Sequence, residues 1–222
     1  MNRPYDVITF DCYGTLIDWE TGIGEAFAAT AAALRAPVDT ARAVALYATV
    51  EPEVEAESFR SYREVLTETA LRVAKRLGWP LPESRAGFLA DSLPYWRPFP
   101  DTNRALLRLA DAGYRLGILS NVDDELLMWT RRQLLARFDI VVTAEQVRSY
   151  KPAPGHFTAA RDLIGAERWL HAAQSYIHDV MPARSLGIPV AWINRKGEKA
   201  SDGGKADHEF TTLAGLASWL AP

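Results

Sequence analysis

Four charged or polar groups in this sequence follow apolar segments and have side chains suited to nucleophilic chemistry. Asp11 comes after YDVITF, Ser120-Asn121 closes YRLGILS, Lys151 lies in SYKP, and Asp179 lies before a stretch that ends in LGIPVAWIN. A carboxylate can attack an electrophilic carbon and hold the product as an ester, provided that nearby positive charge keeps the carboxylate ionised. Lys151 can supply that charge. These residue types indicate a hydrolase that carries an ester intermediate on Asp11.

Smaller polar groups near these charges can orient them. The hydroxyls of Thr15 and Ser120 and the amide of Asn121 can donate hydrogen bonds to the carboxylate or to an acidic group of the substrate. Each of the chemical groups also has a simpler interpretation. An aspartate before a glycine is often a turn residue, Ser120-Asn121 and Asp179 can cap helices, and Lys151 can be a solvated loop residue. The four segments together favour the catalytic interpretation.

The elements that must position these groups alternate between strand-like and helix-like segments. We predict strands over 5–12, 114–120, 139–143, 175–179 and 189–194, and helices over 102–112, 125–136, 155–163 and 212–220. This alternation favours an α/β fold, a doubly wound parallel sheet with a Rossmann-like core, whose ligand lies outside the carboxyl ends of the strands. The segment 19–96 reads as helical throughout. We therefore predict a core domain from residues 1–16 and 98–222, with a helical cap at 17–97 that covers the site.

The ordered segments DCYGT, ILSN, SYKP and an aspartate eight residues before the glycine of LGIPVAWIN resemble the haloacid dehalogenase superfamily over essentially the whole chain. Phosphatases of that superfamily carry a second aspartate where this chain has Tyr13, and a metal-binding aspartate where it has Ser175. Mg²⁺ favours carboxylate oxygens, so the loss of both argues against a metal phosphatase. Tyr13 within D-x-Y-G-T is similar to the (S)-2-haloacid dehalogenases, which work without metal.

That resemblance implies a role for each matched residue. The implied substrate is a small molecule with a carboxylate, with no metal and no other cofactor, and related enzymes often form homodimers. Asp11 would displace halide from the α-carbon with inversion, and water activated with the help of Asp179 and Lys151 would then attack the ester. The implied catalytic residues are Asp11, Thr15, Ser120, Lys151 and Asp179, and the implied substrate-binding residues are Cys12, Tyr13, Asn121, Ser175 and Tyr176.

The sequence departs from that group in its cap. The stretch LYATVEPEVEAESF, where those dehalogenases carry a halide-binding arginine, offers Glu51, Glu53 and Glu55, and their expected tyrosine after KP is Phe157. Arg60 and Arg63 lie just beyond and can bind an anion or face solvent. Three alternatives therefore stay open: hydrolysis of another C–X bond or a strained ring, a Mg²⁺-dependent phosphatase acting on a small phosphomonoester, and a binding protein on a former enzyme scaffold.

Composition narrows the class of protein. The net charge of −3 and the pI near 5.8 provide no basic field that would attract nucleic acid or anionic lipid. The start of the chain lacks the apolar region of a signal peptide, and no apolar run is long enough to cross a membrane. The single cysteine, Cys12, excludes an internal disulfide. We expect a cytoplasmic protein with neither nucleic acid nor membrane as partner.

Overall fold

The computed structural model describes residues 3–222, which form two compact units. The first unit contains residues 3–17, Pro98–Asn121 and Arg132–Pro222. The second contains Asp18–Arg97 and Val122–Arg131. This division differs from the predicted one mainly at Val122–Arg131, which the sequence interpretation assigned to the core. Each unit is described by itself.

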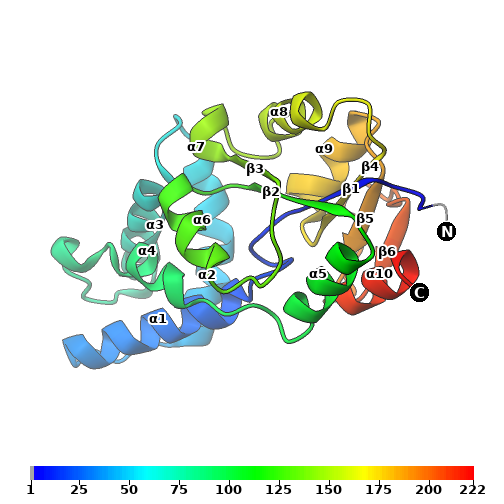
Figure 1. Ribbon diagram of the computed structural model, residues 1–222. Helices are drawn as coiled ribbons and strands as arrows, with labels where there is room; N and C mark the ends of the chain where they lie inside the picture. The colour runs from blue at the N-terminus through cyan, green and yellow to red at the C-terminus, as the bar shows by residue number, and fades with distance from the viewer. Residues whose placement is uncertain (1–2) are drawn as a thin grey trace. The chain divides into compact units, whose positions relative to one another are not determined.

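The first unit is built on a six-stranded parallel sheet (Figure 1) in the order β3-β2-β1-β4-β5-β6. Every strand pairing is parallel, so all the carboxyl ends lie at one edge. The four strands β1, β2, β4 and β5 are almost wholly buried, as expected for strands covered on both faces. The strands are β1 Val7–Phe10, β2 Arg115–Ser120, β3 Ile140–Thr143, β4 Trp169–Ala173, β5 Val190–Ile193 and β6 His208–Phe210.

Helices cover both faces of this sheet, which confirms the predicted doubly wound α/β class. Figure 1 shows α8 and α9 on one side and α5 and α10 on the other, and α5 packs against α10. The apolar stripe of α5, with Ala105, Leu106 and Leu109 buried, explains why this segment is helical and faces the sheet. The helices are α5 Thr102–Asp111, α7 Ala144–Val147, α8 Gly155–Ile164, α9 Met181–Ser185 and α10 Leu213–Leu220.

The second unit consists of helices, with no strand among its residues in the part of the chain that is described. Ser61 and Glu64 form a capping box that starts α3, and Gly78, in a left-handed conformation, ends it. The carboxylate of Asp123 also accepts hydrogen bonds from the backbone amides of Tyr62 and Arg63, at 2.7 and 2.9 Å, which attaches α6 to α3. The helices are α1 Trp19–Leu34, α2 Thr40–Glu55, α3 Tyr62–Leu77, α4 Phe88–Ser92 and α6 Asp124–Arg131, with 3-10 turns at Glu83–Arg85 and Leu93–Tyr95.

Two sequence predictions within the sheet were wrong. The strand predicted at 175–179 is a helical turn, Tyr176–Val180, and the fourth strand is the preceding Trp169–Ala173. The hydroxyl of Ser175 accepts a hydrogen bond from the backbone amide of His178 and so starts the turn. The short edge strand β6 was missed altogether because two of its three residues are polar.

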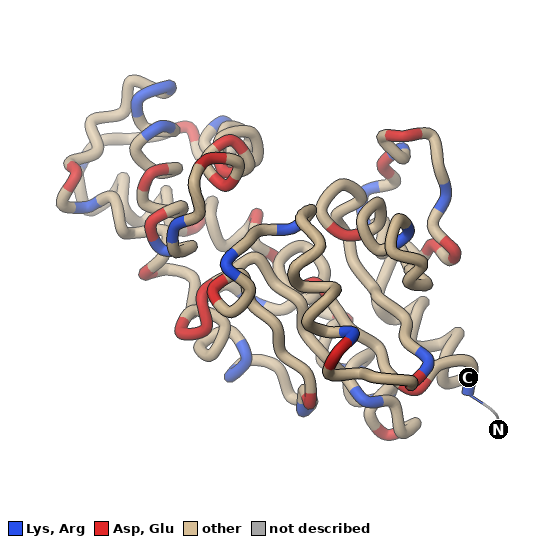
Figure 2. Tube along the Cα trace, turned by 90° about the horizontal axis from the view of Figure 1, so that it is seen from above, with Lys and Arg blue, Asp and Glu red and all other residues tan. Residues whose placement is uncertain are grey.

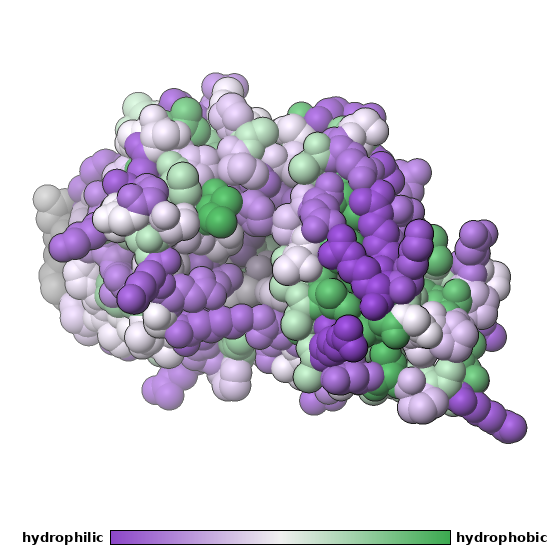
Figure 3. Space-filling model, turned by 180° about the vertical axis from the view of Figure 1, so that it is seen from behind, coloured by the Kyte–Doolittle hydropathy of each residue, from purple (hydrophilic) through white to green (hydrophobic). Residues whose placement is uncertain are grey.

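Charged residues of both signs are distributed along the chain (Figure 2), and much of the surface is hydrophilic (Figure 3). Basic and acidic positions are interspersed along the trace in Figure 2. On the face shown in Figure 3, hydrophilic side chains predominate and hydrophobic ones gather only in small groups. Among residues 3–222, no helix combines the length and the apolar character needed to cross a bilayer.

Candidate active site

Asp11 lies directly after β1, one of the two middle strands, at the edge where the carboxyl ends of the strands meet. Its Oδ2 accepts a hydrogen bond from the hydroxyl of Thr15 at 2.8 Å, and its Oδ1 accepts one from Lys151 Nζ at 2.9 Å. The Thr15 hydroxyl in turn accepts from the backbone amide of Gln174 at 2.8 Å, so its proton points at Asp11. The side chain of Asp11 is 10% exposed, which leaves a narrow access for a reacting atom.

The side chain of Lys151 is a buried ammonium ion, and three acceptors take up its three N–H groups. Its Nζ donates to Asp11 Oδ1 at 2.9 Å, to Asp179 Oδ1 at 2.6 Å and to the Leu119 carbonyl at 2.9 Å. Burial alone would lower the pKa of Lys151, but the two carboxylates outweigh it and raise the pKa above its usual range. An ammonium with three protons donated and a raised pKa stays charged, so Lys151 acts as an electrostatic partner and cannot serve as a base.

Asp179 is the second carboxylate on that ammonium. Burial would raise its pKa, but Lys151 and a hydrogen bond with His171 lower it to about 2. Asp179 Oδ1 accepts from Lys151 and lies 3.0 Å from His171 Nε2, whereas the buried Oδ2 has no hydrogen-bond partner among residues 3–222. Asp179 is therefore ionised at neutral pH and has one oxygen available to accept a proton.

The pKa of Asp11 moves the other way. Burial raises it, Asp179 adds to the rise, and Lys151 and Thr15 oppose it. Both carboxylates contact the same nitrogen, so they titrate as a pair in which the more deeply buried Asp179 keeps its charge to lower pH. The two carboxylates thus differ in how readily each is protonated, although both contact the same ammonium.

Ser120 and Asn121 end β2 beside the lysine. The amide of Asn121 bridges the backbone of Lys151, donating to its carbonyl at 3.0 Å and accepting from its amide at 2.7 Å. Asn121 therefore holds the loop that carries the ammonium. The Ser120 hydroxyl is buried and has no partner within residues 3–222, while its carbonyl lies 3.0 Å from His156 Nε2. Burial lowers the pKa of His156 to about 3, with a contribution from Lys151, so His156 is neutral and donates to that carbonyl.

The remaining predicted residues have contacts of other kinds. Cys12 has no exposed surface, so its thiol is not open to a substrate in this structure. Tyr13 is half-buried and forms a β-bridge with Ile17. Ser175 caps the helical turn, and the hydroxyl of Tyr176 donates to Asp202 at 2.7 Å. Substrate binding by these four residues stays a prediction.

The residues present do not fit a Mg²⁺ site. Lys151 occupies the Oδ1 atoms of both carboxylates, Tyr13 brings no carboxylate, and the Ser175 hydroxyl is engaged by a backbone amide. Three or more metal-binding His, Cys, Asp or Glu side chains do not gather anywhere in residues 3–222. The positive charge that contacts both carboxylates is the Lys151 ammonium.

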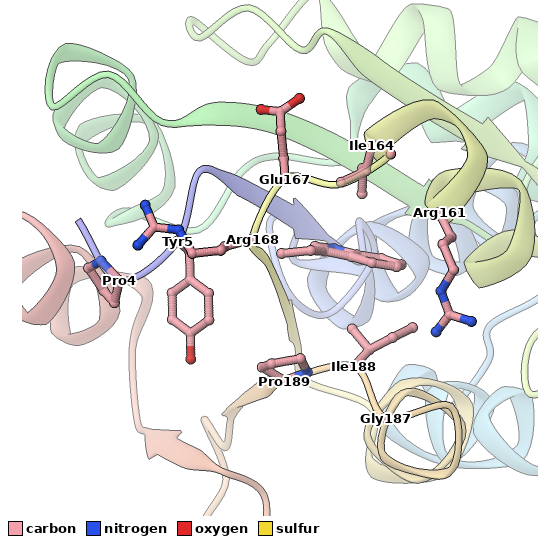
Figure 4. A pocket seen from close by; sticks show the side chains of 11 residues that line it. Pro4, Tyr5, Arg161, Ile164, Glu167, Arg168, Gly187, Ile188 and Pro189 are labelled. Atoms are coloured by element: carbon pink, nitrogen blue, oxygen red, sulfur yellow. The ribbon is translucent and has the colours of Figure 1, made fainter. Parts of the chain in front are cut away.

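A pocket of about 400 Å³ lies elsewhere in the first unit (Figure 4). Its walls include Tyr5, Arg168 and Pro189, which precede β1, β4 and β5, so the pocket is at the amino ends of the strands. Asp11 and Ser120 lie at the opposite, carboxyl ends of β1 and β2. Arg168 is also paired with Asp6, at 2.8 Å. The pocket is therefore not part of the candidate site.

Sequence reasoning missed two histidines of this site. His156 and His171 are both fully buried, and each contacts a residue that was predicted to be functional. His171 lies within the apolar run WLHAA, where a single histidine resembles an ordinary core residue. Its position eight residues before Asp179 becomes informative only when the chain turns back after β4.

Comparisons with known proteins identify the family and the fold of the chain. Residues 5–172 match the family model of the haloacid dehalogenase-like hydrolases. An (S)-2-haloacid dehalogenase of Pseudomonas putida is 30% identical over 162 residues, 71% of each chain. A second one from that organism, (S)-2-haloacid dehalogenase H-109, is 28% identical over 98% of this chain and 99% of its own. The structure of L-2-haloacid dehalogenase from Xanthobacter autotrophicus with chloropropionic acid covalently bound superposes with a TM-score of 0.83 at 20% identity, covering 96% and 97% of the two chains.

Proposed function

Because the chain belongs to the haloacid dehalogenase-like hydrolases, we propose that it is a metal-independent hydrolase that removes halide from a short 2-haloalkanoic acid through an ester on Asp11. One observation carries the proposal: a single buried ammonium, Lys151, bridges Asp11 and Asp179 at 2.9 and 2.6 Å. The relatives named (S)-2-haloacid dehalogenase support the substrate class.

In the first step, a carboxylate oxygen of Asp11 attacks the α-carbon opposite the halogen. The C–O bond forms as the C–X bond breaks, halide leaves with the bonding electrons, and the configuration at carbon inverts. Lys151 and Thr15 hold the carboxylate in place for that attack. The unpartnered hydroxyl of Ser120 is suited to donate to the substrate carboxylate, since a buried hydroxyl without a partner is costly in the free enzyme.

In the second step, water attacks the carbonyl carbon of the Asp11 ester. Asp179 Oδ2 accepts one water proton and then returns it to the departing alkoxide, which leaves as a 2-hydroxy acid. The regenerated carboxyl of Asp11 loses its proton to solvent, so the sum is haloacid plus water giving hydroxy acid, halide and a proton. Lys151 stabilises the negative charge that develops on the ester oxygen.

Hydrolysis of another C–X bond or of a strained ring is the second candidate, because the usual anion-binding groups are changed. Glu51 on α2 accepts a hydrogen bond from Tyr62 at 2.9 Å. Arg60 is paired with Glu57, and Arg63 with Asp91. In each case a carboxylate within the second unit already engages the arginine, and a free halide would have to compete with it.

Chloride release decides between these candidates. The purified protein is incubated with (S)- and (R)-2-chloropropionate and with chloroacetate, in the presence of EDTA, beside the Asp11→Asn variant. We expect the wild-type protein to release chloride and the variant to release none. Folded wild-type protein that releases no chloride would exclude these substrates. Non-halide leaving groups, and a Mg²⁺-dependent phosphomonoester assay, are then the next tests.

A further inference from the structure

His171 contacts Asp179, the proposed base, but has no role in the two steps described above. It lies on β4 with no exposed surface, and its Nε2 is 3.0 Å from Asp179 Oδ1. An ionised carboxylate can only accept hydrogen bonds, so this nitrogen must carry a proton. Together with Lys151, His171 fills Oδ1 and leaves Oδ2 without a partner among residues 3–222.

The other ring nitrogen is held by a short chain of buried groups. His171 Nδ1 is 2.8 Å from the hydroxyl of Thr9, which lies opposite it on β1 in the parallel register. The indole of Trp169 donates to that hydroxyl at 2.7 Å. An indole N–H can only donate, so the Thr9 oxygen accepts from Trp169. In the imidazole tautomer that carries its proton on Nε2, Nδ1 is an acceptor, and the Thr9 hydroxyl donates to it. Every polar atom of the chain Trp169–Thr9–His171–Asp179 Oδ1 is then satisfied.

Packing restricts the imidazole further. The ring of Phe157, on α8, meets the His171 ring edge-on at a centroid distance of 5.2 Å and is itself fully buried. With both nitrogens engaged and the perpendicular ring of Phe157 packed beside it, the imidazole has one orientation. The position of Nε2, and with it that of the Asp179 carboxylate, is determined by the packing between β1, β4 and α8.

We propose that His171 is a positioning residue for the hydrolysis of the ester. It donates Nε2–H to Asp179 Oδ1 and holds the carboxylate so that Oδ2 faces the water that attacks the ester carbonyl. The inference rests on the proposed function for its kinetic consequence, but the hydrogen bond from His171 to Asp179 stands independently of the substrate. Asp179 is the group that meets the water, and His171 acts through it.

The hydrogen bond is tested first, in the wild-type protein without substrate. Long-range ¹⁵N–¹H correlation spectra of ¹⁵N-histidine-labelled protein at pH 7.5 report which imidazole nitrogen is protonated, and the signals of His171 are assigned by their loss in His171→Gln. We expect a protonated Nε2 whose proton resonates downfield, as in a hydrogen bond to a carboxylate. An Nε2 that carries no proton overturns the proposal, whatever the protein hydrolyses.

The kinetic role is tested by separating the two steps. Single-turnover mixing with (S)-2-chloropropionate measures ester formation as chloride release and ester decay by intact-protein mass. His171→Leu removes the donor at similar volume, and His171→Gln places an amide N–H near the position of Nε2. We expect His171→Leu to slow ester decay about 10- to 100-fold, with ester accumulating and chloride release changed less than about threefold, and His171→Gln to restore most of the decay rate.

A purely structural role predicts a different result. If His171→Leu slows both steps to the same extent, or if His171→Gln is as slow as His171→Leu, the positioning role is wrong. Thr9→Val is the second variant, for the case that His171→Leu does not fold: it keeps the shape of Thr9 and removes the support of Nδ1. It should slow ester decay several-fold and leave ester formation unchanged, and an equal loss in both steps again contradicts the proposal. Wild-type protein that releases no chloride excludes dehalogenation of these substrates, while the NMR result still decides the hydrogen bond.

Discussion

Replacing Lys151 by methionine should reverse the pH dependence of stability. The native ion pair between Lys151 and Asp179 loses its stabilising effect as pH falls, whereas the variant should lose stability as pH rises. The native pKa of Asp179 is about 2, against 3.8 for an unperturbed aspartate. A lowered native pKa stabilises the fold above the unfolded pKa, and this contribution of about 2 kcal/mol is lost as pH falls from about 4 to about 2. Methionine has a similar volume but leaves Asp11 and Asp179 buried without a counter-ion.

In Lys151→Met, burial then raises the pKa of both carboxylates. A raised pKa costs stability as pH rises, because the unfolded chain releases protons that the folded chain must keep. We expect the variant to be about 3–5 kcal/mol less stable than wild type at pH 7, the cost of breaking a buried pair, and much closer to wild type at pH 3. Urea unfolding followed by tryptophan fluorescence, from pH 3 to pH 8, measures the difference.

Two companion variants make this test specific. Adding Asp179→Asn to Lys151→Met removes one uncompensated charge and should recover part of the lost stability at pH 7. Arg168→Met breaks the pair with Asp6, whose pKa is also lowered to about 2 but whose partner side chain is 49% exposed. There we expect a small effect that disappears in high salt. A difference between Lys151→Met and wild type that does not change with pH would refute the reasoning.

Three further predictions concern other parts of the molecule. Burial raises the pKa of Glu51 from 4.5 to about 7, so the folded protein loses stability as the pH rises through 7 and Glu51 ionises. Glu51→Gln should therefore stabilise the protein by about 1–3 kcal/mol at pH 8 and change its stability little at pH 4, as measured by urea titration. In α1, a Cβ on Gly22 would lie 2.4 Å from the Trp96 side chain, whereas one on Gly24 would meet nothing closer than 3.7 Å. Gly22→Ala should thus destabilise by about 1–3 kcal/mol and Gly24→Ala stabilise by about 0.5–1 kcal/mol in thermal unfolding. Asn121→Ala removes both hydrogen bonds to the lysine loop and should lower kcat for chloride release, with a lower Tm.

The sequence predicted the parts of the fold that local patterns determine. The buried run before Asp11 and the apolar run before Ser120 are strands, and parallel strands bring their carboxyl ends to one edge, so these polar residues meet there. Lys151 was expected near Asp11 on grounds of charge, and the structure brings it to 2.9 Å. The α/β class followed from the same alternation of strand-like and helix-like segments.

What the sequence did not reveal depends on contacts between distant residues. The fourth strand was placed six residues too late, because SYIHD and WLHAA are both short mixed runs and only the Ser175 cap distinguishes the turn from the strand. The grouping of α6 with the second unit depends on Asp123 meeting the start of α3, 61 residues away. No periodicity encodes such contacts. The same holds for the hydrogen bonds that link Trp169, Thr9, His171 and Asp179, because they join residues of two different strands, β1 and β4.

The hydrogen bonds of Lys151 determine where the second half of the proposed reaction must be controlled. All three of its protons are donated, one of them to a backbone carbonyl, so it cannot take a proton from water. Asp179 Oδ2 is a buried carboxylate oxygen of this cluster that lacks a partner among residues 3–222. Ester hydrolysis in the proposed reaction then depends on how accurately that oxygen is held. Lys151 and His171 both hold the Asp179 carboxylate, but Lys151 also contacts Asp11, the proposed nucleophile. Changes at His171 can therefore alter the second step without altering the first.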